Sequence, residues 1–442
     1  MRIQISDSFN FKKLIRFTMP SIIMLIFTSV YGVVDGFFVS NFVGKTAFAA
    51  TNFIYPVIMI LGSCGFMLGT GGGALISKTM GEGKSEKAKK LFSLIVYCSI
   101  ACGILLAVLG FIFIKPIASM LGAQGELLTN SVTYARIILI AIPAYILQFE
   151  FQCLFVTAGK PTLGLYVTIA AGLTNMLLDA LFVAVFKWGL EGAAVATAIS
   201  QLVGGLIPVI YFACPNRSLL RLGKTNFDIR ALIKTCTNGA SELMSNISMS
   251  LVSMLYNAQL LKYAGEDGVA AYGVLMYVSL VFQAVYIGYS VGTAPIIGYN
   301  YGAQNHKELK SLIRKSLILT GCFAVIMFAA AFALSKPLSN VFVGYDEGLL
   351  NMTVHAFSIF SFSFLFSGFA IFGSSFFTAL NNGLISALIS FMRTLVFQVA
   401  AVLIFPLIWQ LDGIWISIVA ADFLSIIVTI IFLKTNKKKY HY

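Results

Sequence analysis

The chain has 442 residues, of which 59% are hydrophobic and only 11% are charged, and its mean hydropathy is +0.90. Soluble globular proteins carry about 25% charged residues, so this composition excludes an ordinary soluble domain and indicates many membrane spans. The formal net charge of +13 could point to nucleic acid, but the basic residues follow a topology rule, and we expect no nucleic-acid partner.

Long apolar runs follow one another along the whole chain. The start, MRIQISDSFNFKKLIRF, has no early apolar core, so we expect no cleavable signal and a first apolar segment that stays as a span. A transmembrane helix needs about 20 apolar residues, and longer runs must tilt, bend or leave the lipid. Runs bounded by charge, Gly or Pro predict twelve helices, at residues 14–40, 47–77, 91–113, 128–157, 162–186, 191–213, 229–262, 268–298, 313–334, 350–378, 384–408 and 414–433.

The connecting loops alternate in charge. Loops such as KTMGEGKSEKAKK and HKELKSLIRK, and the tail KTNKKKYHY, are rich in Lys and Arg, whereas AGEDG, GYDEG and LDG are not. Basic loops face the cytoplasm in membrane proteins. We therefore expect a multi-pass protein of the cell (plasma) membrane with both termini in the cytoplasm.

The two halves of the chain repeat each other. GEGKSEKAKKLF at Gly81 matches GAQNHKELKSLI at Gly302, 221 positions later, and KPIASMLG/KPLSNVFVG and LEGAAV/LDGIWI recur at the same spacing. The repeat predicts an all-α protein of two six-helix lobes, residues 1–213 and 229–442, joined by a cytoplasmic linker at 214–228. Six helices are an even number, so both lobes insert in the same orientation and face each other across a central cleft.

Few ionisable residues lie inside the predicted spans, and such residues are costly in lipid and commonly functional. They are Asp35, Arg136, Glu150, Asp179, Glu242, Arg393 and Asp422. Asn175 and Asp179 are four residues apart, so they share one helix face, as do Thr197 and Gln201.

The repeat makes one group of these residues more informative. The positions 221 residues after Asn175, Asp179 and Thr197 carry only Val, Ala and Ile. A packing role would be needed in both lobes, so the asymmetry favours a function. Two carboxylates with amide and hydroxyl oxygens can take up a proton or coordinate a small hard cation. The alternative is that Asp179 only completes an internal hydrogen-bond network.

The chain resembles the multidrug and toxic compound extrusion (MATE) transporters. The resemblance covers the whole chain and rests on the duplication, on MP…VDGFFV in the first helix, on FVTAGKPTLGLY, and on TNMLLD…LEGAAVATAIS. It implies the MATE/MOP-type fold, V-shaped with a central cleft, and it implies secondary active transport.

Family members with an acidic site in the amino-terminal lobe, the DinF-like branch, imply roles for individual residues here. The matching ion-coupling residues are Asp35, Asn175, Asp179 and Thr197, where Na⁺ or a proton would bind, and Pro20 matches a helix-1 proline that acts as a conformational hinge. Another branch places acids in helices 7 and 10. This chain has Glu242 in helix 7 but no acid in the tenth predicted helix, so we do not expect a complete second ion site.

The candidates for the substrate cleft are two acidic residues of the predicted spans and four other residues whose polarity is unusual inside a span. They are Glu242, Glu150, Tyr256, Asn257, Gln283 and Tyr286. Glu242 could attract a cationic substrate or pair with Arg393. We interpret Arg393 and Asp422 as a structural pair, and the many Phe residues of the tenth predicted helix as lipid-facing or core.

Other classes of function find little support in the sequence. GTGGGA (69–74) ends an apolar run instead of following a strand, there is no GxxxxGK[ST] motif, and three His and seven Cys form no metal or catalytic pattern. We expect no enzyme activity, no cofactor beyond a coupling H⁺ or Na⁺, and no need for a second copy of the chain, hence a monomer.

The main functional prediction is a secondary antiporter in the lipid bilayer. It would export small organic cations or hydrophobic drugs in exchange for protons or sodium. The alternative is a flippase or exporter of a lipid-linked or amphipathic anionic metabolite, which predicts a basic central cleft.

Overall fold

The computed structural model describes residues 3–216 and 218–442, and in this part of the chain all regular structure is helical. Short π- or 3₁₀-helical segments continue several of the α-helices. The α-helices are α1 (Phe11–Phe38), α2 (Lys45–Gly81), α3 (Ser85–Met120), α4 (Gly125–Thr157), α5 (Pro161–Asp179), α6 (Gly189–Ala213), α7 (Ile229–Gly302), α8 (His306–Val343), α9 (Glu347–Phe360), α10 (Phe364–Ala379), α11 (Gly383–Phe391), α12 (Phe397–Ile404) and α13 (Pro406–Tyr440).

Eleven helices in the described residues are long and apolar enough to cross a membrane. The two predicted spans at 229–262 and 268–298 form one 74-residue helix, α7, which turns back at Gly265. The polar AGEDG segment suggested a loop, but one residue with φ of 66° is enough to reverse the direction. Glycine adopts this backbone conformation without steric cost, so the turn needs no loop.

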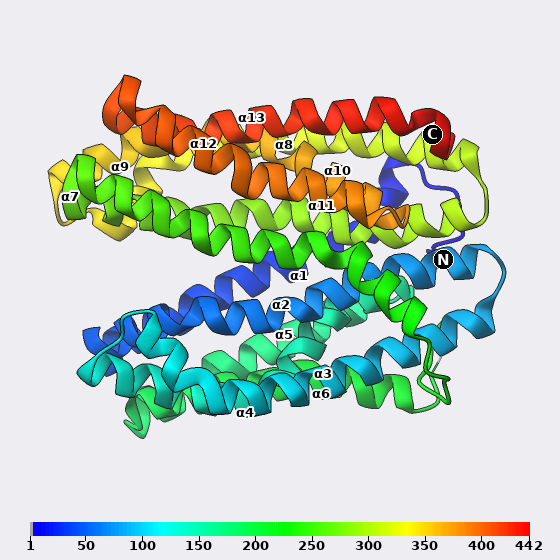
Figure 1. Cartoon of the computed structure of the whole chain (residues 1–442), viewed down its shortest axis with the longest axis horizontal. Helices are drawn as coiled ribbons and strands as arrows, with labels where there is room; N and C mark the ends of the chain where they lie inside the picture. The colour runs from blue at the N-terminus through cyan, green and yellow to red at the C-terminus, as the bar shows by residue number, and fades with distance from the viewer. Residues whose placement is uncertain (1–2, 217) are drawn as a thin grey trace.

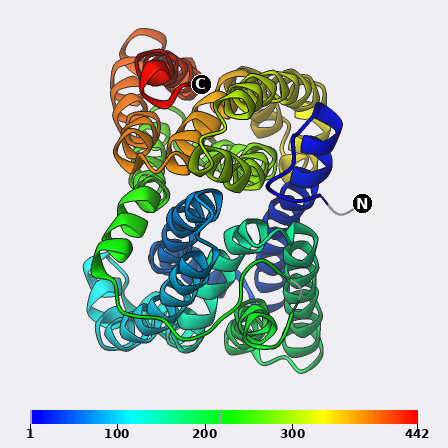
Figure 2. The same ribbon diagram turned by 90° about the vertical axis from the view of Figure 1, so that its right-hand side faces the viewer.

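The helices of the two halves of the chain gather on two sides of the molecule. Figures 1 and 2 show α2 to α6 on one side and α7 to α13 on the other, with α1 passing between them. Near its start α1 lies against α7, since Gly288 and Gly292 pack on Ile22 and Thr18. Farther along, Phe27 and Tyr31 of α1 pack on α5 of its own half. The outward faces of the repeat-related α3 and α8 are apolar and exposed, as lipid contact requires.

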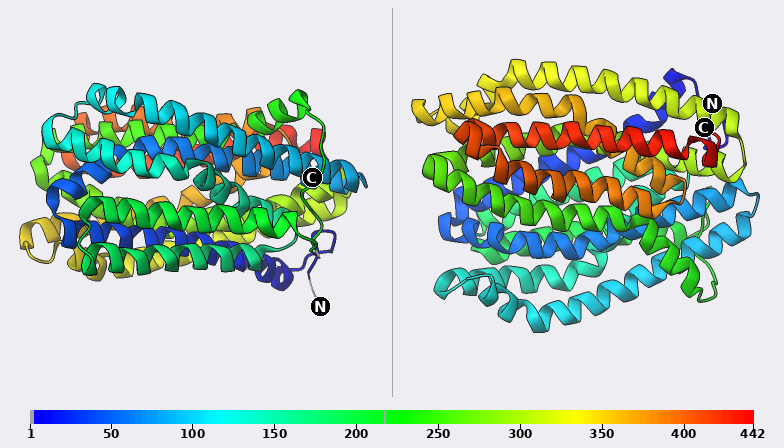
Figure 3. Two further views of the ribbon diagram at one scale, coloured as in Figure 1. Left: turned by 90° about the horizontal axis from the view of Figure 1, so that it is seen from below. Right: turned by 45° about the horizontal axis from the view of Figure 1, so that its top comes forward.

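Both described ends of the chain lie at one end of the molecule, which we call the terminal end; the other is the far end (Figure 3). At the terminal end, α2 and α7 touch through backbone atoms. A side-chain carbon added at Gly71, Gly81 or Gly302 of one half would overlap a carbonyl oxygen of the other half. The same holds at Gly239, where the carbonyl of Met67 is in the way. The halves are therefore closed on each other at this end.

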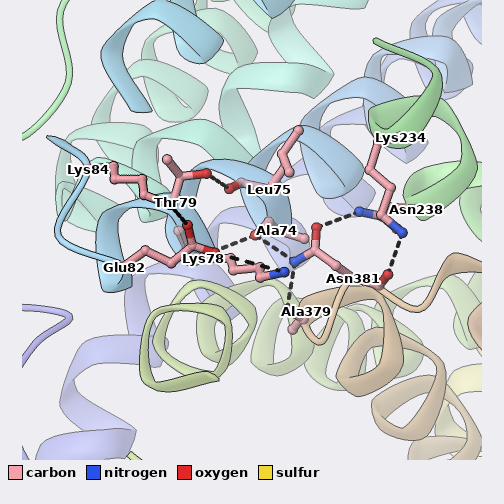
Figure 4. Close-up of polar contacts among 11 residues, drawn as sticks. Ala74, Leu75, Lys78, Thr79, Glu82, Lys84, Lys234, Asn238, Ala379 and Asn381 are labelled. Carbon is pink, nitrogen blue, oxygen red and sulfur yellow. Dashed lines mark hydrogen bonds and ion pairs between the residues drawn. The ribbon is translucent and has the colours of Figure 1, made fainter. Parts of the chain in front are cut away.

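A buried asparagine adds polar contacts to the same closure (Figure 4). Asn381, in the turn between α10 and α11, donates from Nδ2 to the Ala74 carbonyl of α2 at 3.1 Å. Its Oδ1 accepts from Asn238 Nδ2 at 2.7 Å, and its carbonyl accepts from Lys234 Nζ at 2.8 Å. Asn381 has φ of 59°, a conformation that Asn tolerates better than most residues.

The segment before α1 also joins the two halves at the terminal end. The Phe9 amide donates to Glu308 Oε1 of α8 at 2.9 Å, and Lys315 Nζ donates to the Phe9 carbonyl. Ile5 and Phe9 are buried in the core that both halves share. The start of the chain is thus anchored on the carboxy-terminal half.

The segment that joins α6 to α7 runs across the terminal end and is attached to α3. The Gly223 amide donates to Ser93 Oγ at 3.0 Å, and Thr225 Oγ1 donates to the Lys90 carbonyl at 2.8 Å. Leu220 is fully buried, and Asp228 caps the start of α7. Most of the linker therefore belongs structurally to the amino-terminal half.

Candidate functional site: an acidic cluster without a counter-ion

Three helices bring the four predicted ion-coupling residues together. Asp35 comes from α1, Asn175 and Asp179 from α5, and Thr197 from α6. Asn175 Nδ2 donates to Thr197 Oγ1 at 3.4 Å, and Thr197 Oγ1 donates to Asp35 Oδ1 at 3.3 Å. Asp35 and Asp179 are near enough to interact directly. The four-residue spacing on α5 places both of its polar side chains on the face that meets α1 and α6.

The cluster contains acceptors that the described residues do not satisfy. Both carboxylate oxygens of Asp179, and Oδ1 of Asn175, are buried and accept no hydrogen bond from another described residue. The exposed fractions of the two residues are 0% and 2%. No Lys, Arg or His of the described chain forms a salt bridge with Asp35 or Asp179.

Two buried carboxylates without a basic partner require a proton or a cation to reduce their negative charge. Burying an isolated carboxylate costs several kcal/mol, and two neighbouring carboxylates repel each other in addition. A proton would remove one charge and create a donor for the other carboxyl group. A small cation could instead use the free oxygens of Asp179, Asn175 and Asp35 as ligands, because carboxylate and amide oxygens suit hard cations.

The local helix geometry at the cluster is irregular. The regular α-helix of α5 ends at Asp179 and continues as a π-helix over Ala180–Val185. On the other side of the site, α1 is followed by a π-helix over Val39–Val43. Such segments occur frequently at functional sites, where they change the direction of side chains and free backbone groups.

Sequence reasoning missed the tyrosines around the cluster. Tyr31 lies one helical turn before Asp35, and its hydroxyl accepts from Gln148 Nε2 of α4 at 3.4 Å. Tyr134, also on α4, lies close enough to interact with Asp35 and Thr197. The four-residue spacing of Tyr31 and Asp35 is a signal that could have identified the first of these residues.

The predicted hinge, Pro20, lies inside α1, which is continuous from Phe11 to Phe38. Its helical turn is the one that packs on α7, next to Ser21 and Ile22. A change in the bend of α1 at this point would alter the contact between the two halves. The role of Pro20 stays a prediction.

The carboxy-terminal half contains a different polar cluster. Arg393 Nη1 lies 3.9 Å from Asp422 Oδ1, with exposed side-chain fractions of 15% and 5%. Glu242 of α7 lies within electrostatic range of the same guanidinium. The Tyr256 hydroxyl donates to Gln398 Oε1 at 2.6 Å. The predicted pair of Arg393 and Asp422 is present in the structure.

The remaining cleft candidates have different surroundings. The Tyr286 hydroxyl is buried and donates to the Phe364 carbonyl at 2.7 Å, and Gln283 donates to Ser279 Oγ at 3.0 Å. Asn257 lines a mainly apolar hollow of about 490 Å³ near Gly265, at the far end. Glu150 is fully buried, and neither carboxylate oxygen has a hydrogen-bond partner in the described residues. Glu150 and Glu242 both lie within electrostatic range of Cys153, whereas Asn257 lies at the far end.

Comparison with known proteins decides the family. The MatE family model matches the chain twice, at residues 20–181 and 243–404. The chain belongs to the MatE family. This is a family of membrane transporters, so the predicted class, a multi-pass membrane protein, is confirmed, and the two matches lie one in each half of the chain.

Curated MatE relatives include the multidrug export protein MepA of two staphylococci. The Staphylococcus aureus (strain NCTC 8325 / PS 47) protein is 26% identical over 361 residues, which cover 81% of this chain and 79% of the relative. The Staphylococcus haemolyticus (strain JCSC1435) protein is 26% identical over 329 residues, covering 73% and 72%.

Solved structures of MATE proteins share the fold. A MATE protein in complex with MaL6 superposes with a TM-score of 0.93 at 21% identity, over 98% of both chains. A MATE family transporter of the MOP superfamily in an outward-facing conformation gives 0.92 at 21%, over 98% of this chain and 97% of that one. A MOP superfamily transporter from Pyrococcus furiosus gives 0.92 at 21%, over 98% of both chains. The predicted all-helical MATE fold is confirmed.

Proposed function

We propose that this MatE protein is a secondary antiporter that exports organic cations or hydrophobic drugs in exchange for protons or sodium. The observation that carries the proposal is the acidic cluster of the amino-terminal half, whose Asp179 oxygens have no partner in the described residues. A transporter driven by an ion gradient needs a site whose charge depends on the ion. Asp35, Asn175, Asp179 and Thr197 have the chemistry of such a site, similar to that of the DinF-like branch.

The orientation of the protein in the membrane is inferred from the distribution of charge. The basic loops and both termini lie at the terminal end, which we assign to the cytoplasm by the positive-inside rule. The halves are closed on each other there, so in this conformation the acidic cluster is separated from the cytoplasm. We propose two six-helix lobes, twelve spans when the two arms of α7 are counted separately, that alternate between this state and one open at the terminal end.

The coupling step uses the electrostatics of the cluster. An ion arriving from outside would remove one of the two negative charges of Asp35 and Asp179 and favour the closed terminal end. Its absence would leave two buried negative charges, which favour a rearrangement of α1 around Pro20 against α7. One elementary charge crossing the membrane potential corresponds to ~2.3 kcal/mol per 100 mV, so the potential drives export when more positive charge enters with the ions than leaves with the substrate. In an exchange of equal charges the ion concentration gradient alone drives export.

A cationic substrate fits the buried charges better than an anionic one. Glu150 and Glu242 are acidic, and the main basic residue of the buried interior, Arg393, already has Asp422 beside it. The names of the MepA relatives, which are multidrug export proteins, support the same choice. An anionic lipid-linked substrate, as a flippase would carry, would require a basic cleft.

The test is ethidium movement in proteoliposomes under an imposed proton or sodium gradient. Wild type should move ethidium with one of the two gradients, and Asp179→Asn should abolish this movement. Glu191→Gln is the matched control, because it makes the same change at an exposed acid of the same half and should transport normally. Normal transport by folded Asp179→Asn would refute the ion site. Failure of wild type with both gradients would favour the flippase.

A further inference from the structure

The two halves place different residues around their buried carboxylates. At the repeat spacing of 221 residues, Asp35 corresponds to Tyr256, and the other three members of the acidic cluster correspond to apolar residues. By the same spacing α1 corresponds to the first arm of α7, α5 to the stretch from α11 to α12, and α6 to α13. The carboxy-terminal polar cluster is built on these three related elements, from Tyr256, Arg393 and Asp422.

The contacts of this second cluster leave Asp422 with an internal counter-charge. Arg393 Nη1 lies 3.9 Å from Asp422 Oδ1, and both side chains are largely buried. Asp422 from α13 is the ion-pair partner of the Arg393 guanidinium, and Glu242 from α7 lies within electrostatic range of it. The Tyr256 phenol lies near Asp422, but its proton is used in the 2.6 Å hydrogen bond to Gln398.

The physical difference between the halves is the origin of the positive charge. The acidic cluster has two carboxylates and no basic side chain in the described residues, so its charge must come from solution. The second cluster instead has the Asp422 carboxylate with the Arg393 guanidinium beside it, at 3.9 Å. Arginine stays protonated in proteins, so this charge neither leaves nor depends on an ion gradient.

We propose that Arg393 is a built-in cation that takes the place of a coupling ion in the carboxy-terminal half. It neutralises Asp422 in every state of the transport cycle and so confines ion coupling to the amino-terminal half. Arg393 sets the number of ions coupled to each cycle without touching either ion or substrate. The inference rests on the proposed function, because it assumes that the acidic cluster is the coupling site.

Removal of Arg393 should convert the second cluster into an ion-dependent one. In Arg393→Met, Asp422 would be a buried carboxylate without a counter-ion, as the carboxylates of the acidic cluster are. A proton or sodium ion from solution would then stabilise the folded protein by binding there.

The experiment measures the melting temperature of the purified full-length chain in a sodium titration at fixed pH and in a pH series at fixed sodium. In wild type the melting temperature should depend on the ion, and Asp35→Asn/Asp179→Asn should abolish this dependence. Adding Arg393→Met to that double variant should restore an ion-dependent shift, and adding Asp422→Asn as well should remove it again. Arg393→Lys, which keeps the charge, should restore nothing.

The results for these variants distinguish failure of this inference from failure of the proposed function. Ion dependence that persists in Asp35→Asn/Asp179→Asn would contradict the proposed ion site, whatever Arg393 does. If that dependence is lost but folded Arg393→Met restores no shift, the role of Arg393 is refuted. Asp422→Asn alone gives a test that does not require Arg393→Met to fold. It should leave the ion dependence of wild type unchanged, and its loss would overturn the inference.

Discussion

The terminal end and the far end of the molecule differ in how closely the two halves approach each other. At the terminal end, glycines of α2 and α7 are pressed against carbonyl groups of the opposite half, and even one added carbon has no room. At the far end, a carbon added at Gly32, Gly44 or Gly273 would meet nothing within 4 Å. The glycines of α2 and α7 therefore permit close contact between the halves at the terminal end, and these three glycines make no such contact at the far end.

The difference also shows in the polar contacts. At the terminal end Asn381 forms a hydrogen bond with the opposite half at 3.1 Å, and the chain start is bound to α8. Toward the far end, the described residues of α1 and α7 form one side-chain hydrogen bond with each other. It is long: Ser29 Oγ donates to the Leu280 carbonyl at 3.4 Å. The energy that holds this conformation is thus concentrated at the terminal end.

The largest expected effect on stability comes from a substitution that disrupts the close contact between α2 and α7 at the terminal end. Gly239→Ala places a carbon against the Met67 carbonyl, and overpacking of this kind costs ~1–3 kcal/mol. Gly273→Ala, in the same helix α7 but with open space around it, should cost nothing and can gain up to ~1 kcal/mol from helix propensity. Melting temperatures of the two purified variants compare the ends directly. Equal values would show that the terminal end is not tightly packed.

A smaller effect is expected from a variant that removes a hydrogen bond between the halves at the terminal end and adds no atoms. Asn381→Gly keeps the positive φ but loses the hydrogen bond to Ala74 across the halves, worth about 0.5–1.5 kcal/mol, so the open terminal end should become about 2- to 13-fold more populated. Spin labels at Lys87 and Lys307 in a cysteine-free background report the distance between the halves at this end.

The matched control for this variant is Gln304→Gly. Gln304 also has a positive φ at the terminal end, and its exposed side chain makes no hydrogen bond among the described residues. It should leave the distances between the labels unchanged. A second pair of labels, at Glu126 and Tyr345, should report closure of the far end as the terminal end opens. An Asn381→Gly distribution identical to that of wild type would exclude Asn381 from the closure.

The smallest expected effect concerns the surface of the terminal end. The Lys13 ammonium, 2.8 Å from Asp7, and then the Gln4 amide hold the pKa of Asp7 below its usual value of 3.8. Because the pKa is lowered by folding, the stabilisation is present above that usual value and is lost as the pH falls through the lowered one. Solvent screening limits it to below about 1 kcal/mol. Asp7→Asn should therefore melt slightly earlier than wild type at neutral pH and together with it in strong acid.

The sequence predicted the helices, the duplication and the composition of the acidic cluster. These features depend on local patterns: apolar runs of sufficient length, a constant spacing of 221 residues, and the four-residue spacing of Asn175 and Asp179. The family model later matched one segment in each half, in agreement with the predicted duplication.

Other features depend on contacts that no local pattern contains. The turn of α7 at Gly265 looked like a loop because its neighbours are charged, although one glycine was enough. Asn381 lies in a short NNG segment with no recognisable motif, and its importance comes from Ala74, which is 307 positions away. Glu150 was selected for its charge, but burial against α2, where Gly69 packs on its backbone, is a property of the packed helices.

The attachment of the linker to α3 limits how the molecule can open. Hydrogen bonds hold Gly223 and Thr225 to α3, so only three residues, 226–228, remain free before α7 begins at Ile229. Three extended residues span at most about 11 Å. The two halves are therefore joined by a short connection along one side of the molecule. When they separate at the terminal end, they must rotate about that side. The widest gap will form on the opposite side, where the chain start crosses to α8.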